Sequence, residues 1–156
     1  MKRRFTSFLI VVALLGCNFE INFGDTDGQV LTDPGPEEER VAAFAFADEV
    51  LDSLDQGEDI YPRVAPYLRE SVPKPLFDST ISGLRGWVGP LKSRTARGYG
   101  YTNELDDAPP GNYFVIEYDS EFESGEATEK VVVSFDENGY FVAGYFLNRT
   151  WSTGGE

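Results

Sequence analysis

Apolar residues recur every three or four positions in the stretch that follows Pro36. The recurring residues are Val41, Phe44, Ala47, Leu51 and Leu54. This spacing places them on one face of a helix, and the sequence predicts that helix over residues 37–56. Pro36 suits the first turn, the glutamates at 37–39 suit the positive end of the helix dipole, and Gly57 is placed to end the helix.

Proline divides the next segment into shorter pieces. Four prolines occur within 14 residues, at positions 62, 66, 73 and 75. A proline inside a helix removes a backbone hydrogen bond and clashes with the preceding turn. The pattern therefore predicts two short helical pieces, over residues 61–69 and 74–84.

After Gly89-Pro90 the periodicity changes from helical spacing to alternation. Over residues 112–122 two sets of side chains alternate, which predicts a half-buried strand. One set is Phe114, Ile116, Tyr118 and Phe122, and the other is Tyr113, Val115, Glu117, Asp119 and Glu121. The first set is mostly apolar, so we expect it to face the core and the second set to face solvent.

Three further strands are predicted, over residues 91–102, 128–136 and 140–148. Asn138-Gly139 lies between the last two and favours a tight hairpin turn. Gly98 and Gly100 indicate a bulge or bend in the first strand. Helices followed by an antiparallel meander predict an α+β fold, in which N-terminal helices pack on a curved four-stranded antiparallel sheet.

The amino terminus has the pattern of an export signal. Basic residues at positions 2–4 precede a short apolar run that ends at Gly16 and Cys17. A membrane-spanning helix needs about 20 apolar residues, and here a polar stretch already begins at Asn18. The sequence therefore predicts a signal peptide over residues 1–16.

The stretch Leu14-Leu15-Gly16-Cys17 resembles the lipobox of bacterial lipoproteins, although Leu15 is bulkier than the small residue usual there. The resemblance implies cleavage after Gly16 and a lipid thioether on Cys17. Cys17 is the only cysteine, so no disulfide forms within the chain. Two or three acyl chains would hold the protein at a membrane, since each buried methylene contributes about 0.8 kcal/mol.

The residues after the cysteine predict the domain organisation and the location of the protein in the cell envelope. Residues 17–36 are rich in Gly, Asp, Asn, Thr and Pro, which is typical of a tether, here a lipidated one. Residues 37–151 have the length and aromatic content of a single α+β domain, and 152–156 form a tail. Asn18 in place of an aspartate favours the outer membrane facing the periplasm over the inner membrane, and the extracellular surface stays an alternative.

The charge balance excludes some partners. Removing residues 1–16 takes three of the 13 basic residues and none of the 27 acidic ones, so the formal net charge goes from −14 to −17. Nucleic acid is excluded as a partner, and anionic headgroups are disfavoured. The membrane contact is therefore assigned to the lipid on Cys17.

The chain contains no histidine, which excludes Ser-His-Asp and Cys-His catalysis and zinc sites built on imidazole. Any enzymatic mechanism would have to use carboxylates, tyrosines, lysines or arginines. We predict no catalytic residue, no metal ligand and no cofactor.

Several short motifs lie at the borders of the predicted strands. They are Gly89-Pro90-Leu91-Lys92-Ser93-Arg94, Pro110-Gly111-Asn112-Tyr113, Phe122 with Glu129, and Gly139 through Val142 to Gly144-Tyr145-Phe146. Together, from about Glu39 to Trp151, they resemble an uncharacterised bacterial family, the domain-of-unknown-function family 4019. The resemblance implies an α+β roll similar to nuclear-transport-factor-like or cystatin-like domains, and it implies no activity.

Four charged residues are candidate contacts for a ligand or a cation. Glu117, Asp119 and Glu121 occupy successive outward positions of one predicted strand. The simpler interpretation is a solvated sheet face. The fourth candidate, Arg94, stands in a motif position and is expected to pair with a strand carboxylate such as Glu117 or Glu129, in a structural ion pair.

These observations favour a non-enzymatic, lipid-anchored binding or interaction module of the cell envelope, with an envelope protein or a small ligand as its partner. One alternative is a small enzyme that uses a cavity carboxylate and a tyrosine. Another is a cation-binding envelope protein. An open pocket between helices and sheet that contains an ionisable group would distinguish among them.

Overall fold

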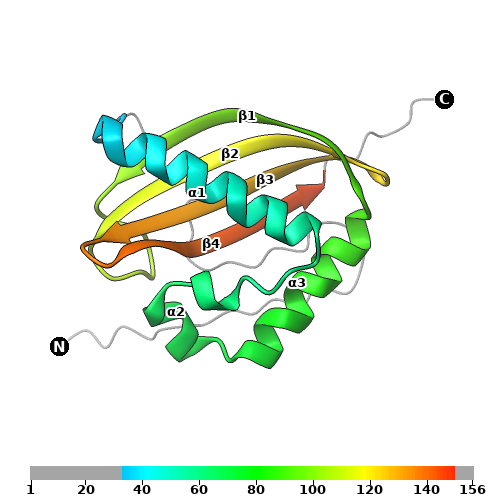
Figure 1. Ribbon diagram of the computed structural model, residues 1–156, viewed down its shortest axis with the longest axis horizontal. Helices are drawn as coiled ribbons and strands as arrows, with labels where there is room; N and C mark the ends of the chain where they lie inside the picture. The colour runs from blue at the N-terminus through cyan, green and yellow to red at the C-terminus, as the bar shows by residue number, and fades with distance from the viewer. Residues whose placement is uncertain (1–32, 150–156) are drawn as a thin grey trace.

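A computed structural model describes residues 33–149, in which four helical segments precede four strands (Figure 1). The helical segments are α1 (Glu37–Asp55), the 3-10 turn η1 (Tyr61–Arg63), α2 (Pro66–Ser71) and α3 (Lys74–Val88). The strands are β1 (Leu91–Thr102), β2 (Asn112–Phe122), β3 (Gly125–Asp136) and β4 (Gly139–Arg149). The predicted signal peptide, Cys17 and Trp151 lie outside the described residues.

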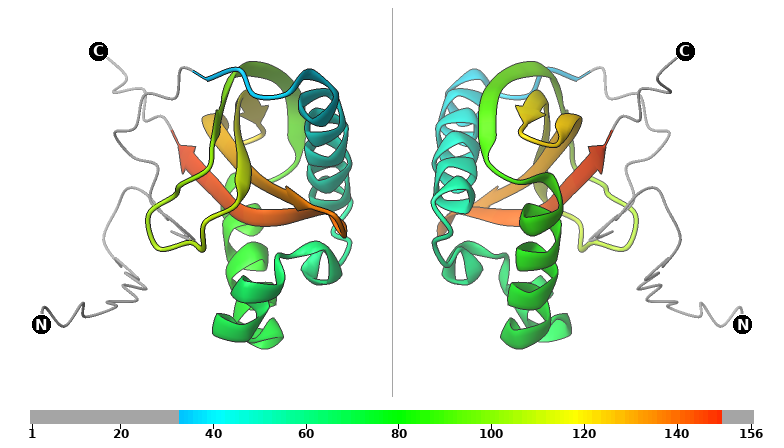
Figure 2. Two further views of the ribbon diagram at one scale, coloured as in Figure 1. Left: turned by 90° about the vertical axis from the view of Figure 1, so that its left-hand side faces the viewer. Right: turned by 90° about the vertical axis from the view of Figure 1, so that its right-hand side faces the viewer.

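The strands form one antiparallel sheet in the order β1-β2-β3-β4, so each strand pairs with its neighbour in the chain. Figure 2 shows α1 against one face of this curved sheet and α3 beside the end of α1, below the sheet. The main core contains buried residues from all three α-helices and from β2, β3 and β4. The prediction of an α+β fold with helices on an antiparallel sheet is confirmed.

The buried face of α1 differs in part from the predicted one. Its buried residues are Ala43, Ala47, Val50, Leu51, Ser53 and Leu54. Val41, which the prediction placed on the core face, is 61% exposed. Ala43 and Ala47 belong to the same helical stripe as Val50 and Leu54, and their small side chains allow α1 to lie close to the sheet. Because the stripe that contacts the sheet passes through position 43, Val41 projects away from the core.

Strand β2 is buried on both faces over its first half. Phe114 and Ile116 face the helices, as predicted, but Tyr113 and Val115 on the opposite face are buried as well. They form a second apolar cluster, with Leu105, Val132, Ala143 and Phe146. The expectation that this set of side chains faces solvent is therefore wrong for Tyr113 and Val115. The loop between β1 and β2 supplies Leu105, and the Tyr113 hydroxyl donates to the backbone oxygen of Pro109 at 2.5 Å.

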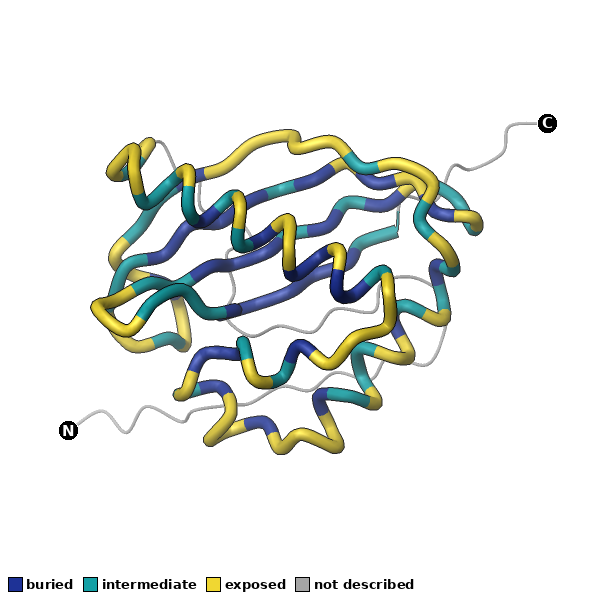
Figure 3. Tube along the Cα trace, in the orientation of Figure 1, coloured by how far each residue is buried: buried dark blue, intermediate teal, exposed yellow. Residues whose placement is uncertain are grey.

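Turn and bulge positions follow the glycine pattern of the sequence. Asp136 and Gly139 are paired across the β3–β4 hairpin, so Glu137 and Asn138 form the turn. Gly139 has φ +122°, a value that non-glycine residues rarely adopt. The β1–β2 register shifts between Ala96 and Gly98, which confirms a bulge at Gly98. Figure 3 shows the buried residues gathered along β2, β3 and β4, whereas β1 is mostly exposed.

The segment just before α1 is attached to the end of β1. Asp33 forms an isolated antiparallel bridge with Tyr101, whose N–H donates to the Asp33 oxygen at 2.9 Å. Gly35 has φ +66°, and a Cβ there would lie 2.8 Å from side-chain atoms of Tyr101 and 2.9 Å from Phe114. The last residues of the predicted tether thus lie against the sheet, in a close approach that only glycine permits.

Candidate functional site

A buried network of charged side chains joins the helices to the sheet. It contains Asp55 at the end of α1, Arg85 in the last turn of α3, Arg94 on β1 and Glu129 on β3. Their side chains are between 0% and 17% exposed. Since two arginines meet two carboxylates, the formal charges of the network balance.

Glu129 is the centre of the network and is completely buried. Its Oε1 atom accepts hydrogen bonds from Arg85 at 3.0 Å and from the Tyr145 hydroxyl at 2.6 Å. Its Oε2 atom accepts from Arg94 Nε at 2.6 Å and from the Ser120 hydroxyl at 2.5 Å. A buried carboxylate is costly unless it is paired and hydrogen-bonded, and here both oxygens have two donors.

Asp55 links the two arginines from the other side. Arg94 donates to its two carboxylate oxygens, from Nη1 at 2.7 Å and from Nη2 at 3.1 Å, in a bidentate pair. Arg85 donates to the same carboxylate through Nη2 and lies 5.2 Å from the centroid of the Phe122 ring. The network therefore fastens the end of α1 and the end of α3 to β1 and β3.

The protonation of the network follows from burial and charge. Burial by itself lowers the pKa of Arg94, but the hydrogen bonds and charges of Asp55 and Glu129 outweigh it, so the pKa is raised. Burial also lowers the pKa of Arg85 when taken alone. The contacts with Tyr145, Glu129 and Asp55 outweigh it, so the pKa of Arg85 is raised. Burial, reinforced by the Glu129 charge, raises the pKa of Tyr145 well above its ordinary value. At neutral pH the arginines are charged and Tyr145 keeps its proton.

The four residues proposed from the sequence fall into two separate places. Arg94 pairs with Glu129, one of its two predicted partners, in the buried network. The three carboxylates of β2 lie on the opposite face, and each has a basic neighbour. These pairs are Glu117–Lys130 at 3.7 Å, Asp119–Arg97 at 3.6 Å and Glu121–Lys92 at 3.8 Å. Among residues 33–149, no group of three acidic, cysteine or histidine side chains is placed to hold a metal ion.

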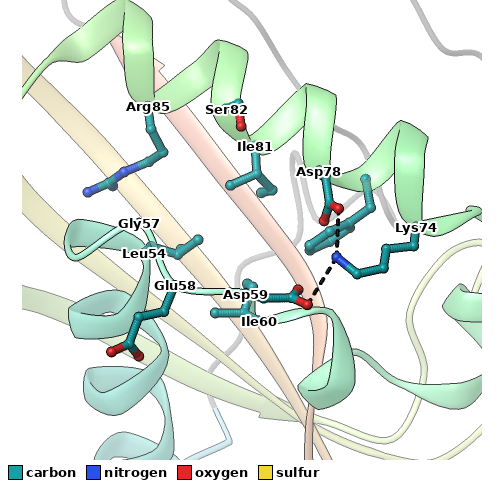
Figure 4. A pocket seen from close by; sticks show the side chains of 11 residues that line it. Leu54, Gly57, Glu58, Asp59, Ile60, Lys74, Asp78, Ile81, Ser82 and Arg85 are labelled. Atoms are coloured by element: carbon teal, nitrogen blue, oxygen red, sulfur yellow. Dashed lines mark hydrogen bonds and ion pairs between the residues drawn. The ribbon is translucent and has the colours of Figure 1, made fainter.

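A groove lies between α3 and the segment that follows α1 (Figure 4). It has a volume of about 330 Å³. Its apolar wall is formed by Leu54, Ile60, Phe77 and Ile81, and its polar lining by Glu58, Asp59, Lys74, Asp78, Ser82 and Arg85. The space between α1 and the sheet, by contrast, is occupied by the apolar side chains of the main core.

An ion-paired basic residue lies at each end of the groove. At the inner end, Arg85 belongs to the buried network and contacts Asp55. At the outer end, the Lys74 ammonium lies 2.6 Å from Asp78 and 3.0 Å from Asp59. The hydrogen bond from Lys74 lowers the pKa of Asp59, and the hydrogen bonds to Asp78 and Asp59 raise the pKa of Lys74.

Sequence reasoning found Arg94 and Glu129 but missed Asp55, Arg85 and the groove. Two signals were available in retrospect. Asp55 is an acidic residue next to the apolar stripe of α1, and Arg85 follows the buried Leu84 in the last turn of α3. Neither signal indicates which residue pairs with Asp55 or Arg85, because the contacts join residues far apart in the chain; Arg85 and Glu129 are 44 positions apart.

Comparison with known protein families shows where this chain belongs. The model of the family "Protein of unknown function (DUF4019)" matches residues 46–145. The chain is a DUF4019 protein. The matched region includes all four charged residues of the network and every residue that lines the groove, so both features lie within the DUF4019 domain. No curated protein and no solved structure matches the chain. Within residues 33–149, no helix is long and apolar enough to cross a membrane.

Two buried tyrosines of this DUF4019 domain predict a loss of stability at high pH. Burial and the neighbouring Asp48 raise the pKa of Tyr118, which donates to Asp48 at 3.0 Å, and the pKa of Tyr145 is raised as described above. The folded state therefore holds both protons above pH 10, where the unfolded chain releases them. Their contribution is fully present below about pH 10 and is lost as the pH rises further.

The measurement is urea unfolding between pH 7 and pH 11. We expect the free energy of unfolding to fall above pH 10 by up to about 1.4 kcal/mol per pH unit for each tyrosine. The Tyr118→Phe/Tyr145→Phe double variant should fall less steeply. Equal slopes for the variant and the unmodified protein would contradict the prediction.

Proposed function

We propose that this DUF4019 protein is a lipid-anchored protein of the bacterial cell envelope that binds a small ligand or an envelope partner without catalysing a reaction. The export-signal pattern and the lipobox-like stretch that ends at Cys17 support this location. Asn18 supports the outer membrane, with the domain facing the periplasm.

The groove beside α3 carries the binding proposal. It combines an apolar wall with a small number of charged groups, which is the usual chemistry of a ligand site. Its inner end is rigid, because Arg85 is tied to Asp55, Glu129 and Tyr145. A rigid wall lowers the ordering cost of binding.

The pairing of the buried groups favours binding over catalysis. Glu129 and Tyr145 are a carboxylate and a tyrosine in contact, the combination that an enzyme of this composition would use. However, both Glu129 oxygens accept two hydrogen bonds, and the side chain is 0% exposed. A general acid or base must reach the proton it transfers, so this pair supports a structural role.

We further infer a roll similar to nuclear-transport-factor-like or cystatin-like domains. The order of the elements supports it, with helices first, a four-stranded meander afterwards, and the helices on one face of the sheet. In this proposal the groove beside α3 takes the place of a cavity between helix and sheet.

The binding proposal is tested by position-specific photo-crosslinking in the native envelope. A diazirine amino acid replaces Ser82, which lines the groove, or Ser79, an exposed residue of α3 that does not line it. We expect a reproducible adduct at position 82 and none at position 79. The same adducts at both positions, or none at position 82, would contradict a binding role for the groove.

A further inference from the structure

We propose that the apolar part of the predicted tether, residues 19–23, packs on the back face of the sheet, which is the face opposite α1. The cover of this face is then a segment of the same chain. The inference concerns a different surface from the groove and does not depend on the binding role of the groove.

The back face carries the second apolar cluster, to which no helix contributes a residue within the part of the chain that the structure describes (Figure 2). Its members from β2, β3 and β4 are each at most 5% exposed, and they are Tyr113, Val115, Val132, Ala143 and Phe146. Three strands span roughly 10 Å at the usual strand spacing. The loop between β1 and β2 adds Leu105 and Ala108. Two side chains from one loop are too few to bury residues of three strands, so we infer a further cover.

The tether joins the sheet at the end that carries this cluster. Asp33 is bridged to Tyr101, and the next residue of β1, Thr102, is paired with Tyr113 of the cluster. Phe23 precedes Asp33 in the chain by a stretch that extends up to about 33 Å. Because the strand order is β1-β2-β3-β4, the far strand β4 lies roughly 19 Å from Asp33 at the usual strand spacing. The segment is therefore long enough to reach every strand of the cluster.

The segment has the sequence pattern of a strand with one apolar side. Its apolar residues alternate with polar ones, as Phe19, Ile21 and Phe23 against Asn18, Glu20 and Asn22. Successive side chains of an extended chain point to opposite sides, so the three apolar side chains share one side. The rest of the tether is rich in Gly, Asp and Pro and offers little else to bury. An apolar side without a partner thus matches an apolar face that needs a cover.

Attachment to the same chain favours this occupant over a separate molecule. A short flexible connection gives a tethered segment an effective concentration on the order of millimolar. An envelope protein or a second copy of the chain would have to exceed that concentration, or bind more tightly, in order to displace the segment.

The packing would also orient the domain at a membrane. Cys17 lies two residues before Phe19, which is about 7 Å of extended chain. Together with the proposed lipid on Cys17, a packed segment would turn the back face toward the membrane and α1, on the other face, away from it. A free tether over residues 17–32 would instead let the domain lie up to about 50 Å from the lipid.

The test is photo-crosslinking of the full chain in its native envelope. A diazirine amino acid replaces Ile21 on the apolar side of the segment or, as the matched control, Asn22 on the polar side. Mass spectrometry identifies the crosslinked residues. We expect position 21 to form adducts with Val115, Val132 or Phe146 of the same chain, at least fivefold more abundantly than position 22.

Two variants of the tether separate apolar packing from simple proximity. Phe19→Ser/Phe23→Ser should lower the yield of the position-21 adduct at least fivefold, because it removes the neighbouring apolar contacts. Glu20→Gln/Asn22→Ser changes as many residues on the polar side and should leave that yield within twofold. Both variants leave the core of the described domain unchanged.

The remaining outcomes would overturn the inference. Equal yields at positions 21 and 22, no adduct at position 21, or adducts spread over α1 and α3 would show that the segment does not pack on the back face. Adducts of position 21 with lipid or another protein, or a product of twice the chain mass, in place of the expected ones would assign a different occupant. The adduct at position 82 reports on the groove alone, so failure of the groove proposal is seen separately.

Discussion

Glu129→Gln is expected to lower the free energy of unfolding by about 3–5 kcal/mol, the usual cost of removing one charge from a buried ion-pair network. Glutamine has nearly the same shape, so the change removes charge and leaves little cavity. Arg85 and Arg94 would then share Asp55 alone, inside a site where both guanidinium groups are at most 14% exposed. The NH2 group of the amide would also replace one carboxylate oxygen, so it would face an arginine donor, Arg85 or Arg94, in either orientation.

Urea unfolding followed by tryptophan fluorescence measures this loss. Glu121→Gln is the matched control, because it makes the same chemical change on the neighbouring strand at a carboxylate that is 53% exposed and 3.8 Å from Lys92. We expect the control to cost less than about 1 kcal/mol. If the two variants lose similar amounts, the network does not stabilise the fold.

Cys17→Ser is expected to abolish lipid attachment and cleavage before residue 17. A serine hydroxyl cannot form the lipid thioether, and no other thiol is present in the chain. In the proposed anchor, acyl chains would contribute about 0.8 kcal/mol for each buried methylene, and the acidic domain would not add attraction to anionic headgroups. The variant should therefore accumulate with residues 1–16 still attached and should lose all labelling by a fatty-acid analogue.

Metabolic labelling and membrane fractionation test this expectation. Asn18→Asp is the matched control, because it changes the next residue and keeps the thiol. It should retain the label and shift the protein toward the inner membrane. Labelling that persists in Cys17→Ser would show that the lipid is not on this cysteine, and the proposed anchor would be wrong.

Local patterns predicted most of the secondary structure. Alternation over 112–122 and the change of period after Gly89-Pro90 located β1 and β2 with the observed bounds. Asn138-Gly139 located the hairpin, and Gly139 with φ +122° directly follows the two turn residues. The third helix extends four residues beyond its predicted end, to Val88, where Gly89 with φ +75° terminates it.

The faces of these elements were predicted less well. Helical spacing allows more than one apolar stripe on α1, and contact with the sheet selected the one through Ala43 rather than Val41. On β2, alternation separated the two faces correctly, yet the loop after β1 folds back and helps to bury Tyr113 and Val115. Burial depends on what covers a face, and the alternation within one strand does not specify the cover.

The sequence by itself determined the order of helices and strands, the antiparallel meander and the acidic character, because these depend on neighbouring residues or on composition. Only the tertiary structure decided that Asp55, Arg85, Arg94 and Glu129 meet, and that a groove lies between α3 and the segment after α1. Charged side chains have many possible partners in a sequence with 13 basic and 27 acidic residues. Which of them pair is set by the packing of helices on the sheet, which brings together residues up to 74 positions apart in the chain.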